Sequence, residues 1–173
     1  LNPEYLSEPS QRVFYERKLS QLVRADRLLA ISEFSREEAL STLNLRANRV
    51  TNISAAVAPD FYSANGREHV APSFMARLRD WGVRDEFLLY VPGGFDARKN
   101  FERLFAAYAL LPKDLRQRYQ LLIPGKLDEG RGVSLMSHAQ AVDLAGDDLL
   151  LVGYVTDEEL RDLYGQAALF VFP

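Results

Sequence analysis

The 173-residue chain has no cysteine and only two histidines, His69 and His138. The lack of cysteine excludes a disulfide framework and thiolate metal sites. The two histidines are far apart and lack the spacing of a zinc site, so we expect no metal ion. No apolar run approaches the roughly 20 residues of a membrane span, and no signal peptide opens the chain. We expect neither a bound cofactor nor a membrane-spanning segment.

The charge balance is slightly acidic, with a net charge of −3 and a pI of about 5.5. This balance argues against a general affinity for nucleic acids, although a site for a small anion needs only local charge. The apolar fraction of 47% and the charged fraction of 26% are typical of a globular protein. The length fits one domain, or one domain and part of another.

A regular alternation of strands and helices begins at Phe87. Apolar runs predict strands, helical spacing and capping patterns predict the helices between them, and their order indicates a parallel sheet with helices on both faces, a Rossmann-like α/β fold. The expected strands are residues 87–91, 119–123, 149–152 and 168–172, and the expected helices are residues 99–111, 133–145 and 157–167. Upstream we expect helices at 10–24, 35–43 and 73–81 and strands at 27–31 and 49–54, with Ser35 and Glu38 as a capping box.

Turn-forming residues without periodicity occupy residues 58–72, which predicts a boundary. The expected domains are residues 1–57, a linker and entry helix at 58–84, and residues 85–173. The chain stops directly after a strand that no helix follows. We therefore expect a piece of a longer protein.

Three strand ends carry glycine, at Gly93-Gly94, Gly125 and Gly153, and ligands of open parallel sheets bind at this edge. Arg98 and Lys99 follow the first of them, at the start of a predicted helix. Cations there oppose the helix dipole by roughly 0.3–1 kcal/mol, so selection for stability alone would not favour them. The pattern predicts a phosphate or nucleotide site.

Other motifs for nucleotide or acyl chemistry are absent. Gly93-Gly94 does not extend to the G-x-G-x-x-G fingerprint, and Gln120 and Leu127 stand where a P-loop needs Gly and Ser or Thr. No serine lies in a G-x-S-x-G elbow. The acidic run Asp157-Glu158-Glu159 is explained by a helix first turn, with Thr156 and Glu159 as a capping box.

Three segments, residues 25–35, 90–100 and 151–173, resemble the GT-B retaining glycosyltransferases of family 4. The resemblance implies that residues 1–57 are the last part of an acceptor-binding domain. Residues 85–173 would be the first part of a domain that binds the nucleotide-sugar donor. The Gly-Gly-Phe-Asp-x-Arg-Lys-Asn run from Gly93 to Asn100 is similar to that of mannosyltransferases of polysaccharide biosynthesis.

The resemblance also implies roles for single residues. Lys99 matches the lysine that neutralises the donor diphosphate, and Gly93 and Gly94 form the turn beside it. Gly94 stands where many members have an arginine. Arg98 is therefore the candidate to replace that arginine in binding the donor diphosphate. The remaining candidates are loop residues at two further strand ends: Gly125 and Lys126 in the second, and Gly153, Tyr154 and Val155 beside the nucleobase.

The function implied is transfer of a sugar, such as mannose, from GDP-mannose or a UDP-sugar to a glycan or lipid-linked acceptor, with retention of configuration. The resemblance places the parent enzyme in the cytoplasm or at the membrane periphery. The family's acidic E-x7-E segment would follow Pro173, so no catalytic residue is assigned. We expect the 173 residues alone to be inactive and to bind nucleotide weakly. Two alternatives stay open, another Rossmann-like nucleotide-sugar or NAD enzyme and a non-catalytic nucleotide-binding module.

Overall fold

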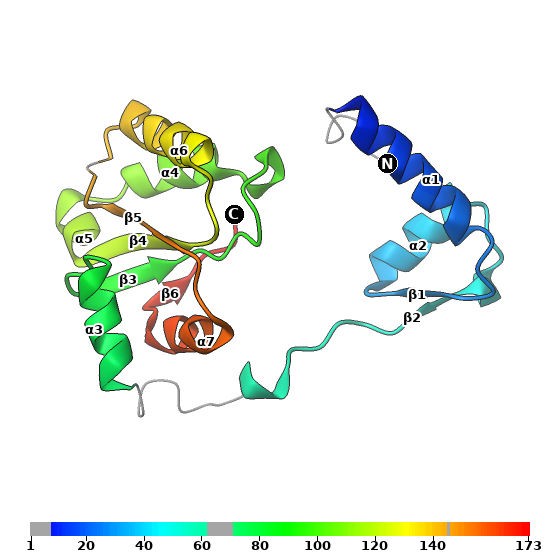
Figure 1. Ribbon diagram of the computed structural model, residues 1–173, viewed down its shortest axis with the longest axis horizontal. Coiled ribbons are helices and arrows are strands. Elements are labelled where there is room, and N and C mark those ends of the chain that lie inside the picture. Colours follow the sequence, from blue (N-terminus) through cyan, green and yellow to red (C-terminus); the bar gives the residue numbers. More distant parts are fainter. Residues whose placement is uncertain (1–7, 62–70, 145) are drawn as a thin grey trace. The chain divides into compact units, whose positions relative to one another are not determined.

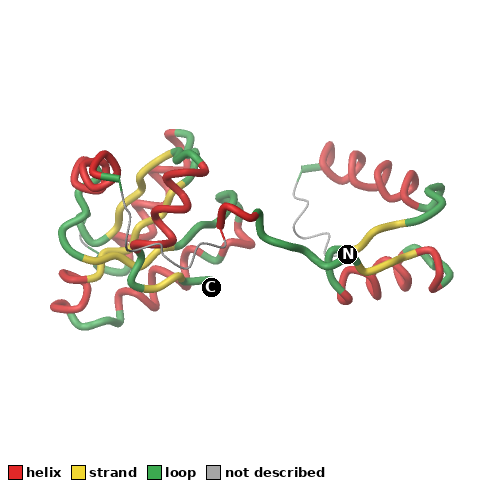
Figure 2. Tube along the Cα trace, turned by 90° about the horizontal axis from the view of Figure 1, so that it is seen from below, coloured by secondary structure: helices red, strands yellow, loops and turns green. Residues whose placement is uncertain are grey.

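The computed structural model describes residues 8–61, 71–144 and 146–173 (Figure 1). The chain divides into two compact units, Leu1–Ala58 and Pro59–Pro173. Each unit has its own parallel sheet. Figure 2 shows the strands and helices of both units in separate colours.

The N-terminal unit contains one β-α-β motif. Strands β1 (Leu28–Ala30) and β2 (Val50–Asn52) pair in parallel, helix α2 (Glu33–Thr42) connects them, and helix α1 (Pro9–Leu22) precedes them. The α2 N-cap is Ser32, whose hydroxyl accepts a hydrogen bond from the Ser35 backbone N–H at 3.1 Å. The predicted Ser35–Glu38 capping box is therefore wrong. Ser32 is extended and lies two residues after the end of β1, so the helix begins three residues before the predicted cap, Ser35.

The C-terminal unit contains a four-stranded parallel sheet in the order β5-β4-β3-β6. The strands are β3 (Glu86–Leu89), β4 (Tyr119–Pro124), β5 (Leu149–Gly153) and β6 (Leu169–Phe170). The helices are α3 (Pro72–Asp80), α4 (Phe101–Ala109), α5 (Lys113–Arg118), α6 (Glu129–Ala141) and α7 (Asp157–Gln166). The expected α/β fold with a parallel sheet is confirmed.

Side chains of this sheet alternate between two apolar cores, as the period of a strand requires. In β4, Leu121 and Ile123 belong to the core shared with α4 and α6, whereas Leu122 belongs to the core shared with α3 and α7. Figure 1 shows these two pairs of helices on opposite faces of the sheet. The central strands β3 and β4 are thus covered on both faces, which explains their apolar runs, whereas Leu169 and Phe170 of β6 are exposed.

Most predicted elements differ from the structure by a few residues at their ends, and three differences are larger. Helix α5 was not predicted, because six residues are too few to show an apolar period. Helix α6 begins at Glu129 rather than Val133, since the Asp128 carboxylate caps it by accepting from the Arg131 N–H at 2.8 Å. Strand β6 has only two residues, Leu169 and Phe170, which pair with Leu88 and Leu89 of β3, whereas the predicted strand covers residues 168–172. The capping box of Thr156 and Glu159 at α7 is confirmed.

Buried Tyr108 makes the unit sensitive to alkaline pH. Its side chain is 3% exposed and its hydroxyl donates to the Tyr119 carbonyl oxygen at 2.8 Å. Burial, together with the charge of Asp148, raises the pKa of Tyr108 to about 12. Because this folded-state pKa exceeds the unfolded value of 10.0, the stabilisation is complete below pH 10 and is lost as pH rises toward 12. We expect a loss of up to about 2–3 kcal/mol in the free energy of unfolding.

Urea denaturation followed by fluorescence of Trp81, the single tryptophan, measures this loss because Trp81 packs against the core of α3 and α7. Tyr108→Phe is the control. It should be less stable than the parent at pH 8 because the hydrogen bond is gone, yet lose less stability between pH 10 and 12. If the free energy of unfolding fell equally in the two proteins between pH 10 and 12, the prediction would be contradicted.

Candidate functional site

A pocket of about 290 Å³ lies where β3, β4 and β5 end, and we name it the strand-end pocket. It is the edge at which open parallel sheets bind ligands. Its lining comes from the three strand-end loops and from the starts of α6 and α7: Val91, Gly93, Gly94, Phe95, Pro124, Gly125, Lys126, Arg131, Tyr154, Val155 and Leu160.

Glycine shapes the floor of the strand-end pocket. Gly93 has a φ of +62°, in the left-handed region that favours glycine. Gly125 has a φ of +150°, and a Cβ added there would lie 2.6 Å from Cε2 of Phe95. The Phe95 ring therefore lies directly against the Gly125 backbone. It also stacks on the ring of Phe101, with centroids 5.4 Å apart and an angle of 9° between the planes.

The basic loop after Gly94 is held by its own side chains. The Arg98 guanidinium donates from Nε to Oδ1 of Asp96 at 2.7 Å and from Nη2 to Oδ2 at 3.1 Å. These hydrogen bonds from Arg98 lower the pKa of the Asp96 carboxyl. The buried Tyr90 hydroxyl donates to the Lys99 carbonyl oxygen at 2.8 Å, which ties the loop to the end of β3. Arg98 and Lys99 lie in a 3₁₀ turn, Ala97–Lys99, and not in the predicted helix, since left-handed Asn100 separates the turn from α4.

The structure brings together six of the nine residues predicted for the site. They line the strand-end pocket: Gly93, Gly94, Gly125, Lys126, Tyr154 and Val155. Gly153 is adjacent, because its carbonyl oxygen accepts from the Gly125 N–H at 2.7 Å. Arg98 and Lys99 are not among the lining residues. Their contact with a diphosphate stays a prediction.

The sequence did not predict five of the lining residues, and two of these, Phe95 and Arg131, bear most on the site. Arg131 stands between Gly130 and Gly132 and before the predicted helix 133–145, whereas in the structure it occupies the first turn of α6. A signal was present, because Asp128 three residues before Arg131 is a common N-cap type. An arginine in a helix first turn opposes the helix dipole, so selection for stability alone would not favour it.

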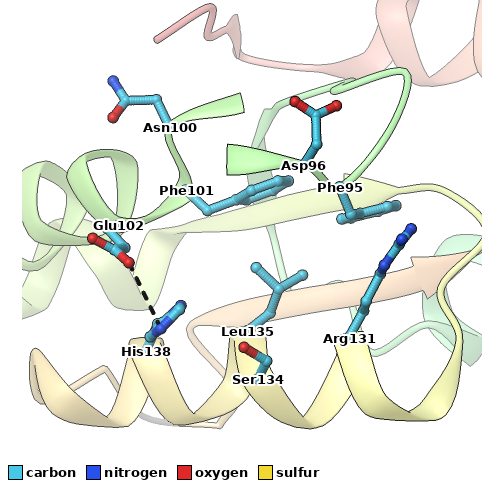
Figure 3. Close-up of a pocket in the computed structure, with 9 residues that line it drawn as sticks. All are labelled: Phe95, Asp96, Asn100, Phe101, Glu102, Arg131, Ser134, Leu135 and His138. Atoms are coloured by element: carbon cyan, nitrogen blue, oxygen red, sulfur yellow. Dashed lines mark ion pairs between the residues drawn. The ribbon is translucent and has the colours of Figure 1, made fainter. Parts of the chain in front are cut away.

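A second cavity of about 280 Å³ adjoins the first and lies between the start of α4 and helix α6 (Figure 3). It shares Phe95 and Arg131 with the strand-end pocket. Its far side carries His138 and Glu102, whose Nε2 and Oε1 atoms are 3.7 Å apart. Both of these side chains are exposed, so the pair is an ordinary surface contact.

Two absences hold for the described residues. None of the helices among residues 8–61, 71–144 and 146–173 is long and apolar enough to cross a membrane. Within the same ranges, no three side chains of His, Asp or Glu gather as metal ligands.

Comparisons with known proteins identify mannosyltransferases with similar sequences. The chain is 34% identical over 174 residues to the serotype-specific mannosyltransferase WbdA of Escherichia coli, a match that covers all of this chain and 21% of WbdA. It is 33% identical over 175 residues to the O-antigen chain mannosyltransferase B of Escherichia coli, covering 99% of this chain and 43% of that protein. The chain thus spans about a fifth of the first relative and less than half of the second.

A solved structure shares the fold. The structure of Anabaena Alr3699/HepE in complex with UDP superposes with a TM-score of 0.67 at 20% identity, over 99% of this chain and 44% of that chain. Such structural neighbours are GT-B glycosyltransferases, and the fold is the expected part of that architecture. The model of the family described as glycosyl transferases group 1 matches residues 79–173, more than half of the chain. The chain belongs to the glycosyl transferases group 1 family.

Proposed function

We propose that the C-terminal unit binds the nucleotide-sugar donor of a sugar transferase in the strand-end pocket. The observation that carries the proposal is the convergence of three glycine-bearing strand ends with Lys126 and Arg131 around one cavity. Gly93 and Gly94 expose backbone to a phosphate without an intervening side chain, and the two cations offset its charge. Tyr154 and Val155 are the proposed neighbours of the nucleobase, with Gly153 supplying backbone beside them.

In this proposal the full-length enzyme transfers mannose from GDP-mannose to a glycan or lipid-linked acceptor, with retention of configuration. Mannose is favoured by the two mannosyltransferase relatives, and a nucleotide-sugar donor by the UDP complex of the structural neighbour. The leaving diphosphate gains negative charge as the sugar departs. Fixed cations and backbone N–H groups at the pocket stabilise that charge without having to reorganise.

Lys99 is proposed to approach the diphosphate from the loop that Tyr90 anchors. The Tyr90 hydrogen bond fixes the Lys99 backbone, while the lysine side chain is only half-buried. Its long side chain can therefore change rotamer without disturbing the loop. Arg98 is the less favoured contact because two atoms of its guanidinium already bind Asp96.

A thermal-shift panel of GDP, UDP, ADP and NAD tests the proposal. Stabilisation grows as RT ln(1 + [L]/Kd), so a ligand at 100 times its Kd adds about 2.7 kcal/mol. We expect GDP to give the largest shift and NAD none. Lys99→Ala and Lys126→Ala should each reduce the GDP shift, whereas Lys113→Ala, a change at an exposed lysine of α5, should leave it intact.

Other outcomes decide between the alternatives. A shift with NAD alone would favour a different Rossmann-like enzyme. Equal losses from Lys99→Ala, Lys126→Ala and Lys113→Ala would place the nucleotide elsewhere. Sugar transfer by the 173 residues alone would contradict the proposal that this piece is inactive without the rest of the protein.

A further inference from the structure

Two arginines lie near the strand-end pocket, and the structure gives them different partners. Arg98 binds Asp96 through Nε and Nη2, and its backbone N–H donates to Asp96 Oδ1 at 3.1 Å. These two side chains are also exposed, at 60% and 44%, but a bidentate guanidinium–carboxylate pair is stronger than a single contact. A ligand that recruited Arg98 would first have to break it.

Arg131 has a weaker partner. Its Nε is 3.4 Å from Oδ2 of Asp128, and the two side chains are 62% and 65% exposed. Ion pairs of this exposed kind add little to stability, so exchanging Asp128 for a phosphate costs little. The Asp128 carboxylate also caps α6 through Oδ1, and that contact does not need the Arg131 guanidinium.

The position of Arg131 suits the far end of a ligand. Tyr154 and Val155 line only the strand-end pocket, whereas Arg131 and Phe95 line both cavities and mark their boundary. In Figure 3 the Arg131 side chain rises from α6 toward Phe95. A nucleotide whose base lies beside Tyr154 can reach Arg131 with its phosphates, because both residues line the same pocket.

We propose that Arg131, and not Arg98, binds the distal phosphate of the nucleoside diphosphate, which then replaces Asp128 as the partner of its guanidinium. This inference rests on the proposed function. Arg131 thereby makes the pocket prefer a nucleoside diphosphate to the monophosphate of the same base. Its planar fork can give two parallel hydrogen bonds to phosphate oxygens, which a lysine cannot reproduce.

Calorimetric titration with GDP and GMP tests the assignment, because only GDP carries the distal phosphate. Arg131→Ala should weaken GDP binding roughly ten- to hundredfold, the loss expected for a hydrogen bond to a charged group, and change GMP binding less than threefold. Arg131→Lys should lie between the alanine variant and the parent. Arg103→Ala, at an exposed arginine of α4 that lines neither cavity, should change neither affinity.

The affinity of Asp128→Asn for GDP is a second test. It should change only if Arg131 binds the ligand, and not if Arg131 has a purely structural role. Asparagine caps a helix about as well as aspartate, so α6 keeps its start while Arg131 loses its competing partner. We expect GDP to bind several-fold more tightly and GMP to be unchanged. Unchanged or weaker GDP binding in this variant would overturn the role given to Asp128.

The remaining outcomes separate this inference from the proposed function. If the parent binds GDP and Arg131→Ala binds it equally well, the inference fails and the proposed function stands. Equal losses for GDP and GMP would also overturn it, as would a larger loss from Arg98→Ala. If the parent binds no nucleoside diphosphate at millimolar concentration, both fail. Trp81 fluorescence confirms that each variant is folded.

Discussion

Replacing Gly125 by alanine is expected to destabilise the C-terminal unit and to abolish nucleotide binding in the strand-end pocket. The new Cβ would lie 2.6 and 2.7 Å from two atoms of the Phe95 ring, closer than real contacts allow. The backbone at φ +150° adds strain of its own. Overpacking of this kind costs about 1–3 kcal/mol, and an unfavourable backbone conformation a further 1–3 kcal/mol.

The loss of binding follows from where Phe95 can go. Its ring stacks on Phe101 on one side and lines the strand-end pocket on the other. Relieving the clash with residue 125 must move the ring away from this stack, and the pocket loses its wall. Urea denaturation by Trp81 fluorescence measures the stability, and the GDP thermal shift measures the binding.

Gly132→Ala is the matched control, because Gly132 lies within α6 and a Cβ there meets nothing within 4 Å. It should stabilise the unit slightly, by about 0.5–1 kcal/mol. The double variant Gly125→Ala with Phe95→Leu separates clash from strain. The double variant should be more stable than Gly125→Ala because the clash is removed, and only the backbone strain at φ +150° should remain. A Gly125→Ala protein that unfolds and binds GDP like the parent would contradict the geometry described here.

The sequence predicted this edge of the sheet because glycine stands out after an apolar strand. Gly93, Gly125 and Gly153 follow three such runs, and parallel strands bring their carboxyl ends together. What the sequence could not show is which side chain lies against which. The contact of Phe95 with Gly125 joins residues 30 positions apart, and no local pattern encodes it.

The charged residues show the same limit. Arg98 and Lys99 are predicted to bind phosphate because they follow the first glycine turn. In the structure, however, the Arg98 guanidinium binds Asp96, two residues earlier. Arg131 was overlooked because Gly130 and Gly132 surround it and mask the helix that Asp128 begins. Local composition identified the cations near the site, whereas their partners depend on rotamers and on tertiary packing.

Gln120 is the residue whose structural role the sequence reveals least, and Gln120→Leu is expected to have a large effect on stability. From sequence it only argued against a P-loop. In the structure it is fully buried in β4, and its side chain binds three backbone groups. Oε1 accepts from the Arg84 N–H at 2.7 Å, and Nε2 donates to the carbonyl oxygens of Gly82 at 3.2 Å and Asp147 at 2.8 Å.

Leucine fills nearly the same volume but leaves all three groups without this partner. Each of the three hydrogen bonds contributes about 0.5–1.5 kcal/mol, so we expect a total loss of about 1.5–4.5 kcal/mol in the free energy of unfolding. The measurement is urea denaturation by fluorescence of Trp81, which directly precedes Gly82. Gln140→Leu, at an exposed position of α6, is the control and should change stability by less than about 0.5 kcal/mol.

Binding should respond differently from stability in this variant. Gln120 lies near the start of β4 and Gly125 directly follows its end, roughly 16 Å apart at the rise of a strand. At low urea, where the unit is still folded, Gln120→Leu should therefore bind GDP with the parent's affinity. Weakened binding by the folded variant would mean that the register of β4, and not only its far end, sets the shape of the strand-end pocket.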